Sequence, residues 1–218
     1  HDHLGNHSKA IEILESISEK SSDVYFSLGN AYRSSGRYDE AEANYLQALQ
    51  IEYNKASVDT LTDYYGNPLP VDDDKQNQVD MICAASPVQR LNMITNITPD
   101  IIVVILSLGN LEYEQNQYTS AEVYYNKALL FVHELYGEGA AVLPAAYTLY
   151  NQALNYHGMK QYHTADRCFT DAIVVFRKLS PGDDTVQIAH ALNRQGINYR
   201  HMKQNSNADQ CFTEAVDI

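Results

Sequence analysis

The sequence contains no tryptophan and only three cysteines among its 218 residues. Cys83, Cys168 and Cys211 form no Cys-x-x-Cys pair, and their odd number argues against a disulfide framework or a cysteine-ligated metal. Such usage is typical of a reducing compartment, in which cysteines serve as packing residues. We therefore predict a cytoplasmic protein.

Basic residues are also scarce, with 15 lysines and arginines against 28 aspartates and glutamates and a formal net charge of −13. This balance argues against nucleic acid or an anionic membrane as a partner. Ile101 to Leu106 is a run of only six apolar residues, whereas a membrane span needs about 20. Because Thr98-Pro99-Asp100 before the run is a typical helix start, we predict a buried helix there.

Motifs for catalysis are absent from the sequence, which has no nucleophile elbow, P-loop or dinucleotide-binding fingerprint. The run Asp72-Asp73-Asp74 lacks the spacing of a calcium loop. His1-Asp2-His3 would bind copper or nickel only at a free amino terminus. We therefore predict a protein that is not an enzyme and that has no catalytic residue, no cofactor and no metal site.

What the sequence does contain is internal repetition. The segment 155–173 recurs 43 residues later as 198–216, with 11 of 19 positions identical. Upstream, the segments 27–49 and 107–129 share 10 of 23 positions. Repeats of this length indicate one supersecondary unit that is stacked along the chain.

Each repeat reads as two short helices joined by a turn. Small and apolar residues recur at spacings of three and four, which marks one face of a helix. The turn position is occupied in successive repeats by Gly36, Asn116, Lys160 and Lys203. Glycine and asparagine suit a left-handed helix end, whereas we expect the two lysines to close the turn in another way.

Two further sets of positions repeat. Small residues mark places where two helices approach closely: Gly29, Gly109, Ala153 and Gly196 in first helices, and Ala41, Ala121, Ala165 and Ala208 in second helices. Aromatic residues of the second helices are expected to fill the space between neighbouring units: Tyr45, Tyr125, Phe169 and Phe212. One helix pair cannot bury such a face, but a stack of pairs can.

This pattern resembles the tetratricopeptide repeat over about residues 22–55, 102–135, 146–179 and 189–218. It departs from that repeat at Glu112 and Asn205, where an aromatic residue is missing. The resemblance implies an all-α fold, a right-handed α-solenoid of antiparallel helix pairs (a TPR-like superhelix). Ala121, Ala165 and Ala208 are 44 and 43 residues apart, and these longer repeats resemble those of kinesin light chains in their geometry.

The repeats divide the chain into segments. Residues 1–20 are expected to form the second helix of a truncated repeat, and repeats follow at 21–55, 101–140, 141–182 and 183–218, the last truncated at its C-terminus. Residues 56–100 hold an irregular insertion or a degenerate repeat, with candidate short helices at 79–85 and 88–97. We favour the insertion, because no small–aromatic–small pattern survives there. The chain is expected to be a piece of a longer array.

The resemblance implies that first helices line a concave groove and second helices form the convex back. The peptide-binding groove positions counted from the repeat frame are Phe26, Asn30, Asn110, Tyr113, Tyr147, Tyr150, Asn151, His190, Asn193 and Arg194. Asparagine amides can hold a peptide backbone, aromatic residues offer apolar pockets, and Arg194 offers a site for a carboxylate. Asn30 and Asn110 could instead bond to neighbouring helices.

These observations favour a non-catalytic scaffold that binds a peptide or protein segment in the concave groove of the solenoid. The alternative is a regulatory repeat region of a larger multidomain enzyme or signalling protein. In both cases we expect a protein or peptide partner, with no nucleic acid and no membrane.

Overall fold

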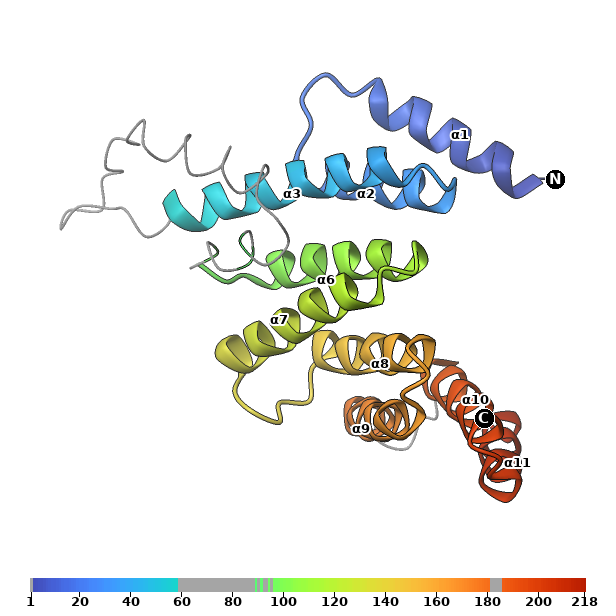
Figure 1. Cartoon of the computed structure of the whole chain (residues 1–218). Helices are drawn as coiled ribbons and strands as arrows, with labels where there is room; N and C mark the ends of the chain where they lie inside the picture. Colours follow the sequence, from blue (N-terminus) through green and yellow to red (C-terminus); the bar gives the residue numbers. More distant parts are fainter. Residues whose placement is uncertain (1, 59–88, 90, 92–93, 95, 181–185) are drawn as a thin grey trace. The chain divides into compact units, whose positions relative to one another are not determined.

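The structure, a computed structural model, describes residues 2–58, 89, 91, 94, 96–180 and 186–218. All regular structure in this described part is helical (Figure 1). The helices are α1 (Asp2–Glu15), α2 (Ser22–Ser34), α3 (Tyr38–Val58), α6 (Pro99–Glu114), α7 (Tyr118–Tyr136), α8 (Leu143–Gly158), α9 (Tyr162–Leu179), α10 (Val186–His201) and α11 (Asn205–Val216). Successive helices pack as pairs, so the predicted all-α solenoid of antiparallel helix pairs is confirmed.

Several sequence predictions concern residues outside the described part. They are the acidic run Asp72–Asp74, Cys83, the candidate helix at 79–85, half of the candidate helix at 88–97, and His1 of the terminal copper or nickel motif. The predicted buried helix after Thr98 is confirmed. It is α6, in which Ile101, Ile102 and Ile105 are fully buried.

The chain forms two compact units, residues 1–111 and 112–218. In the first unit, α2 and α3 form a pair and α1 packs against α2. The pair closes tightly at Gly29, because a β-carbon there would lie 2.5 Å from the ring of Tyr45, which is fully buried. Only glycine leaves room for such a ring against the helix backbone.

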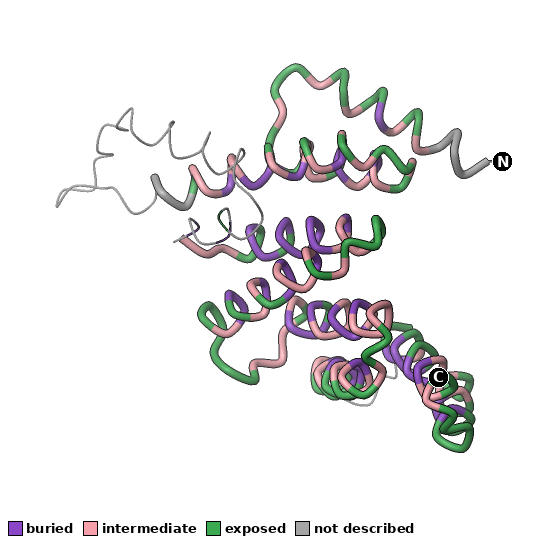
Figure 2. Tube along the Cα trace, viewed as in Figure 1, coloured by how far each residue is buried: buried purple, intermediate pink, exposed green. Residues whose placement is uncertain are grey.

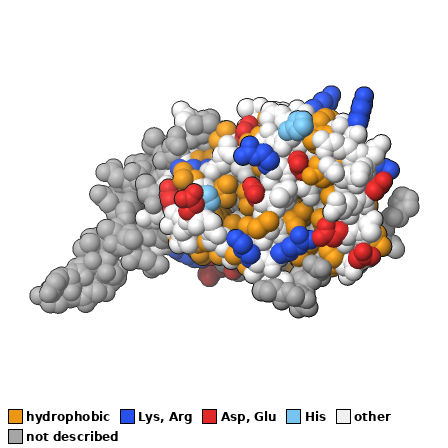
Figure 3. Space-filling view, turned by 90° about the horizontal axis from the view of Figure 1, so that it is seen from below, with side chains coloured by type: hydrophobic (Ala, Val, Ile, Leu, Met, Phe, Trp, Pro, Cys, Tyr) orange, Lys and Arg blue, Asp and Glu red, His pale blue; other side chains and the backbone are white. Residues whose placement is uncertain are grey.

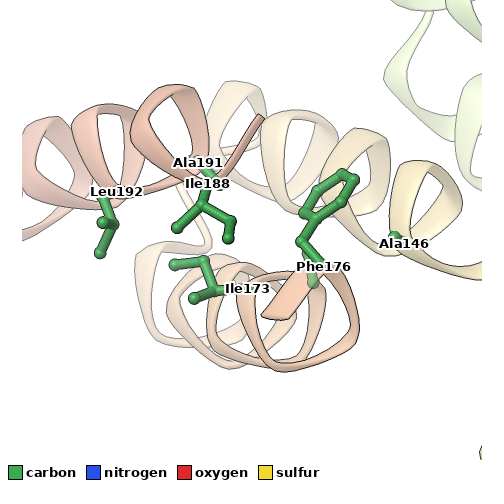
Figure 4. Close-up of a cluster of buried hydrophobic side chains, with 7 residues drawn as sticks. Ala146, Ile173, Phe176, Ile188, Ala191 and Leu192 are labelled. Carbon is green, nitrogen blue, oxygen red and sulfur yellow. The ribbon is translucent and has the colours of Figure 1, made fainter. Parts of the chain in front are cut away.

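In the second unit, α8 with α9 and α10 with α11 form pairs, α7 packs against α8, and α9 packs against α10. Buried residues recur every few positions along these helices, as Figure 2 shows. A core cluster of α8, α9 and α10 contains Ala146, Ile173, Phe176, Ile188 and Leu192 (Figure 4). Each large side chain buried there contributes roughly 1.5–3 kcal/mol. Because the cluster draws on three helices, it joins one helix pair to the next.

The aromatic residues of the second helices lie closer to their own pair than the sequence suggested. Phe169 meets Tyr150 of α8 edge to face at 6.1 Å, in a cluster with Ala153. Phe212 lies over Gly196, where an added β-carbon would be 2.6 Å from its ring. The sequence predicted these rings between neighbouring units, whereas these contacts lie inside one pair, since the small residue opposite each ring leaves space for it.

All four turn residues adopt the left-handed conformation, with φ of 76° at Gly36, 62° at Asn116, 62° at Lys160 and 60° at Lys203. The expectation of a different turn for the two lysines was therefore wrong. After Lys160, the amide of Gln161 donates to the carbonyl of Tyr156 at 2.8 Å, which closes the helix end. Such closure outweighs the roughly 1–2 kcal/mol that left-handed backbone costs a residue with a side chain.

Candidate functional site

The first helices of the second unit share an aromatic pocket. It has a volume of about 70 Å³ and is lined by Tyr147 and Tyr150 of α8, Phe176 of α9, and Gln187 and His190 of α10. Phe176 is 4% exposed and meets Tyr147 edge-on, with ring centroids 5.4 Å apart. The structure thus brings together three predicted groove residues, Tyr147, Tyr150 and His190, around one apolar hollow.

Arg194 lies one helical turn beyond His190 on α10 and is exposed. Burial raises the pKa of the Tyr113 hydroxyl, the nearby Tyr118 adds to the increase, and the positive charge of Arg194 opposes it. The nearby Tyr150 also raises the pKa of this Tyr113 hydroxyl. The predicted residues Tyr113, Tyr150 and Arg194 come from three successive first helices. They therefore lie close enough for Tyr150 and Arg194 to influence the pKa of Tyr113.

Two predicted asparagines sit next to these residues in the sequence. Asn151 adjoins Tyr150 on α8 and is half-buried, whereas Asn193 precedes Arg194 on α10 and is exposed. The second unit therefore contains seven of the ten predicted groove residues.

The other three predicted residues, Phe26, Asn30 and Asn110, belong to the first unit. The hydroxyl of Tyr45 donates to Oδ1 of Asn30 at 2.8 Å, so this amide bonds to the second helix of its own pair. Phe26 lies 5.7 Å from the Tyr45 ring and lines a separate cavity of about 180 Å³. Asn110 is half-buried on α6. The alternative role considered for Asn30, a bond to a neighbouring helix, is the one that this contact supports.

The cavity in the first unit is acidic. Its lining includes three carboxylates and one ring: Asp23, Glu52, Asp100 and Phe26. Glu52 is 5% exposed and accepts hydrogen bonds from Lys55 Nζ at 2.7 Å and from the hydroxyl of Ser22. The bond to Glu52 is the main cause of the raised pKa of Lys55. Sequence reasoning missed Glu52, because a single glutamate on a second helix carries no repeated signal.

Sequence reasoning also missed a set of hydrogen bonds that joins one helix pair to the preceding second helix. Three residues of α8 donate to α7: Gln152 to Asn126 Oδ1 at 2.8 Å, Asn155 to the Tyr118 carbonyl at 3.0 Å, and Tyr156 to Glu122 at 2.9 Å. Their counterparts on α10 donate to α9: Gln195 to Asp166 at 2.8 Å, Asn198 to the Tyr162 carbonyl at 2.8 Å, and Tyr199 to Asp166. The signal was present in the sequence as Gln-x-x-Asn-Tyr, which occurs once in α8 and once in α10.

The two tyrosines of this set, Tyr156 and Tyr199, have raised pKa values. Burial, followed by the hydrogen bond to Glu122, raises the pKa of Tyr156 to about 12. Burial and the bond to Asp166 raise the pKa of Tyr199 in the same direction. Both phenols therefore stay protonated as donors across the physiological pH range.

The described thiols are poorly suited to nucleophilic chemistry. Burial raises the pKa of Cys168 and of Cys211 to about 11, so both are protonated near neutral pH. Among the described residues, no group of three histidine, cysteine or acidic side chains could hold a metal ion.

The described surface and helices also bear on the class of partner. On the part of the face in Figure 3 that the structure describes, lysine and arginine side chains are scattered among acidic and hydrophobic ones. The described part of this face therefore offers no continuous basic stripe to a phosphate backbone. None of the described helices has the length and apolar character required to cross a membrane.

Comparison with known proteins agrees with this architecture. Models of the tetratricopeptide repeat match residues 22–52, 103–139 and 144–218, together about two thirds of the chain. The protein therefore belongs to the tetratricopeptide repeat family, and its longer repeats resemble the kinesin light chain type. No curated protein matches the sequence.

Among solved structures, the crystal structure of BtubC (BKLC) from P. vanneervenii is similar, with a TM-score of 0.63 and 17% sequence identity. The match covers 97% of this chain and 69% of that chain. At this level of identity, the likeness concerns the fold.

Proposed function

We propose that this protein is a non-catalytic scaffold that binds an extended peptide or protein segment along the first helices of its second unit. The observation that carries the proposal is the convergence of Tyr147, Tyr150 and His190 on one apolar pocket, with Arg194 one turn away. Tetratricopeptide repeats generally act as protein-interaction modules, and a pocket of this kind can anchor one apolar side chain of a ligand.

Each neighbouring group has a task in this proposal. The amides of Asn151 and Asn193 offer both a donor and an acceptor to a peptide backbone, whatever its sequence. Arg194 is exposed and offers paired N–H donors to a carboxylate of the ligand. In this proposal the scaffold acts as an adaptor, and its compartment is the cytoplasm. The compartment is inferred from the described cysteines, which are free thiols packed among helices, as is usual in a reducing compartment.

A selected peptide tests this proposal. Peptides are enriched from a random displayed library on the full chain, and the affinity of one is then measured by fluorescence anisotropy. We expect the pair Tyr147→Ala with Tyr150→Ala, and the pair Asn151→Ala with Arg194→Ala, each to weaken binding about tenfold or more, which corresponds to about 1.4 kcal/mol.

The matched control lies on the second helix α9, where Arg167 and Asp171 are exposed. Arg167→Ala with Asp171→Ala should leave the affinity unchanged. Thermal unfolding of each variant checks that the loss of binding is not a loss of fold. Affinity that is insensitive to both groove pairs, or equally sensitive to the control pair, would show that the peptide binds elsewhere.

A further inference from the structure

The C-terminal ends of α8 and α10 bring two histidines together in the second unit. The rings of His157 and His201 meet edge to face, with centroids 5.0 Å apart and an interplanar angle of 73°. Both rings also contact Tyr162, the first residue of α9, at 5.3 Å and 5.2 Å. His157 is half-buried and His201 is exposed, so the pair is reached from solvent.

The preceding repeat is built without histidines at this place. Counted back from the repeated alanine of each second helix, Tyr113 stands at the position of His157, and Gly158 at the position of His201. There the ring of Tyr118 lies 5.8 Å from that of Tyr113, and a β-carbon on Gly158 would lie 2.6 Å from the Tyr118 ring. Since the repeat packs in this way, packing alone does not require the two imidazoles.

A hydrogen bond decides which nitrogen of His157 is available to a ligand. Nδ2 of Asn198 donates to the carbonyl of Tyr162, so Oδ1 of Asn198 is an acceptor. Nδ1 of His157 lies 2.9 Å from that oxygen and carries the proton, which leaves the lone pair of the neutral ring on Nε2. Histidines that bind metal ions are usually oriented like this, with the second ring nitrogen donating to an acceptor. The ring of His201 is oriented by stacking at 11° to the ring of Tyr162.

The spacing of the two rings fits a single bound ion. Zinc binds an imidazole nitrogen at about 2.0–2.1 Å, which puts the ion roughly 3.2 Å from the ring centroid. Two rings that bind one ion at an angle between about 90° and 110° then have centroids roughly 4.5–5.2 Å apart. The 5.0 Å between His157 and His201 lies in this range. Because His201 is exposed, its side chain can turn a nitrogen toward Nε2 of His157 without disturbing the core.

We propose that His157 and His201 bind one Zn²⁺ ion, through Nε2 of His157 and a ring nitrogen of His201, and that the ion ties the end of α8 to the end of α10. Neutral imidazole is a common ligand of Zn²⁺. Among the described residues no third histidine, cysteine or acidic ligand joins the pair, so water completes the tetrahedral shell. The site shares no residue with the aromatic pocket and does not rest on the proposed function.

The sequence analysis predicted no metal site, because His157 and His201 are 44 residues apart and belong to no short ligand motif. Only the packing of successive helix pairs brings the two rings together. The charges of the chain permit a cation here. Arg200, which precedes His201, places its guanidinium over the ring of Phe212 at 5.4 Å, and the formal net charge of −13 attracts cations to the chain.

Titration of the full chain with zinc chloride at about pH 7.5, where an unperturbed imidazole is mostly neutral, tests the proposal. Proton–nitrogen correlation spectra of the imidazoles report each ring nitrogen separately. We expect Zn²⁺ to shift Nε2 of His157 and one ring nitrogen of His201 together, with a single dissociation constant. Zinc is used because His1-Asp2-His3 would compete for copper or nickel at a free amino terminus.

Two substitutions each remove one ligand. His157→Tyr introduces the residue that the preceding repeat has at this position, and His201→Ala shortens an exposed side chain. Each should weaken the binding of Zn²⁺ at least tenfold, while circular dichroism shows an unchanged fold. His163→Ala is the matched control, because His163 is exposed, follows Tyr162 and lies outside the pair. It should leave the affinity unchanged.

Zinc should also stabilise the folded chain, since an ion that binds the folded state more tightly than the unfolded one shifts the equilibrium between them. At about ten times the dissociation constant, the equilibrium constant for unfolding should fall about tenfold in the parent and in His163→Ala, and should change little in His201→Ala.

Four results would overturn the proposal. They are no shift of either ring at about 1 mM zinc, shifts confined to one of the two rings, an affinity that His201→Ala leaves unchanged, and a zinc-dependent dimer in sedimentation, which would mean that the ion joins two chains.

Discussion

Nδ1 of His157 lies 2.9 Å from Oδ1 of Asn198, while Nδ2 of Asn198 donates to the carbonyl of Tyr162. Because that carbonyl fixes the amide orientation, Oδ1 is the acceptor and the imidazole carries its proton on Nδ1. One repeat earlier, Asn155 makes the same bond to the carbonyl of Tyr118. Its Oδ1 is buried, however, and no described residue donates to it.

The difference between the two repeats leads to a first prediction. Tyr113 lies eight residues before Ala121, as His157 lies eight before Ala165, and so stands where the donor should be. We expect Tyr113→His to donate to Asn155 and to raise the free energy of unfolding by about 1 kcal/mol, because a buried unsatisfied acceptor is costly. Urea denaturation measures the change.

Tyr113→Phe is the control for this substitution, since it keeps a ring near Tyr118 but supplies no donor. It should bring no gain. The gain from Tyr113→His should also disappear in the background of Asn155→Ala, as a double-mutant cycle would show. An equal gain from histidine and phenylalanine would mean that packing, and not the hydrogen bond, is responsible.

A second prediction concerns the close approach of rings to glycines. Gly29→Ala should lower the free energy of unfolding by about 2–3 kcal/mol, because the new methyl group would overlap the fully buried ring of Tyr45. Gly196→Ala should cost less, since Phe212 is only half-buried and can move. Thermal unfolding of both variants provides the comparison.

Ser27→Ala is a suitable control, because Ser27 is an exposed residue of the same helix α2. It adds helix propensity without a clash and should leave stability equal or slightly higher. If Gly29→Ala were as stable as Ser27→Ala, the tight contact with Tyr45 could not be a constraint on the fold.

A third prediction follows from the left-handed lysines. Lys160→Gly should raise the free energy of unfolding by about 0.5–1 kcal/mol, because glycine adopts a φ of 62° without steric cost. Lys178→Gly, within the last turn of α9, should instead lower it by about 1 kcal/mol. Chemical denaturation of the two variants should therefore give changes of opposite sign; a loss of stability in both would show that the side chain of Lys160 has a structural role.

A fourth prediction concerns alkaline pH. The pKa of Tyr156 is about 12 in the folded protein, above its ordinary value of 10.0. The unfolded chain therefore loses this proton first, so the contribution of Tyr156 to stability is complete below pH 10.0 and is lost as the pH rises toward the folded value. Tyr199 acts in the same direction.

Urea denaturation between neutral pH and about pH 11 tests this sign. Tyr156→Phe should be less stable than the parent near neutral pH, because the bond to Glu122 is lost, and its stability should fall less steeply above pH 10.0. Tyr199→Phe should behave similarly. A parent and a Tyr156→Phe variant with parallel pH profiles would contradict the role of this phenol.

The fold was predictable from the sequence because its main signals are local. Spacings of three and four around Leu28 and Gly29 identified a helix face, and Gly36 identified the turn that follows it. The backbone conformation of the turn at Lys160 was predicted wrongly, because the prediction considered only how readily each residue type adopts a left-handed backbone. The backbone hydrogen bond that closes the helix end there outweighs the strain of a left-handed lysine.

The candidate site was predictable only in part. The repeat frame selected Tyr147 and Tyr150 because they share a helix face, but it gave no sign that Phe176, from a second helix, contributes a buried wall to their pocket. It also assigned Asn30 to the groove, although the hydroxyl of Tyr45 occupies its acceptor. Repeat positions counted along one helix do not reveal which side chains of the next helix will contact them.

The sequence by itself determined the helix pairs, their turns and the repeated Gln-x-x-Asn-Tyr motif, because periodicity and turn chemistry act between residues close together in the chain. Only the tertiary structure decided which groups meet. His157 finds Asn198, Arg194 acts on Tyr113, and Val216 stays exposed where Ile173 is buried. Such encounters depend on how whole helices pack, and packing joins residues that no local spacing connects.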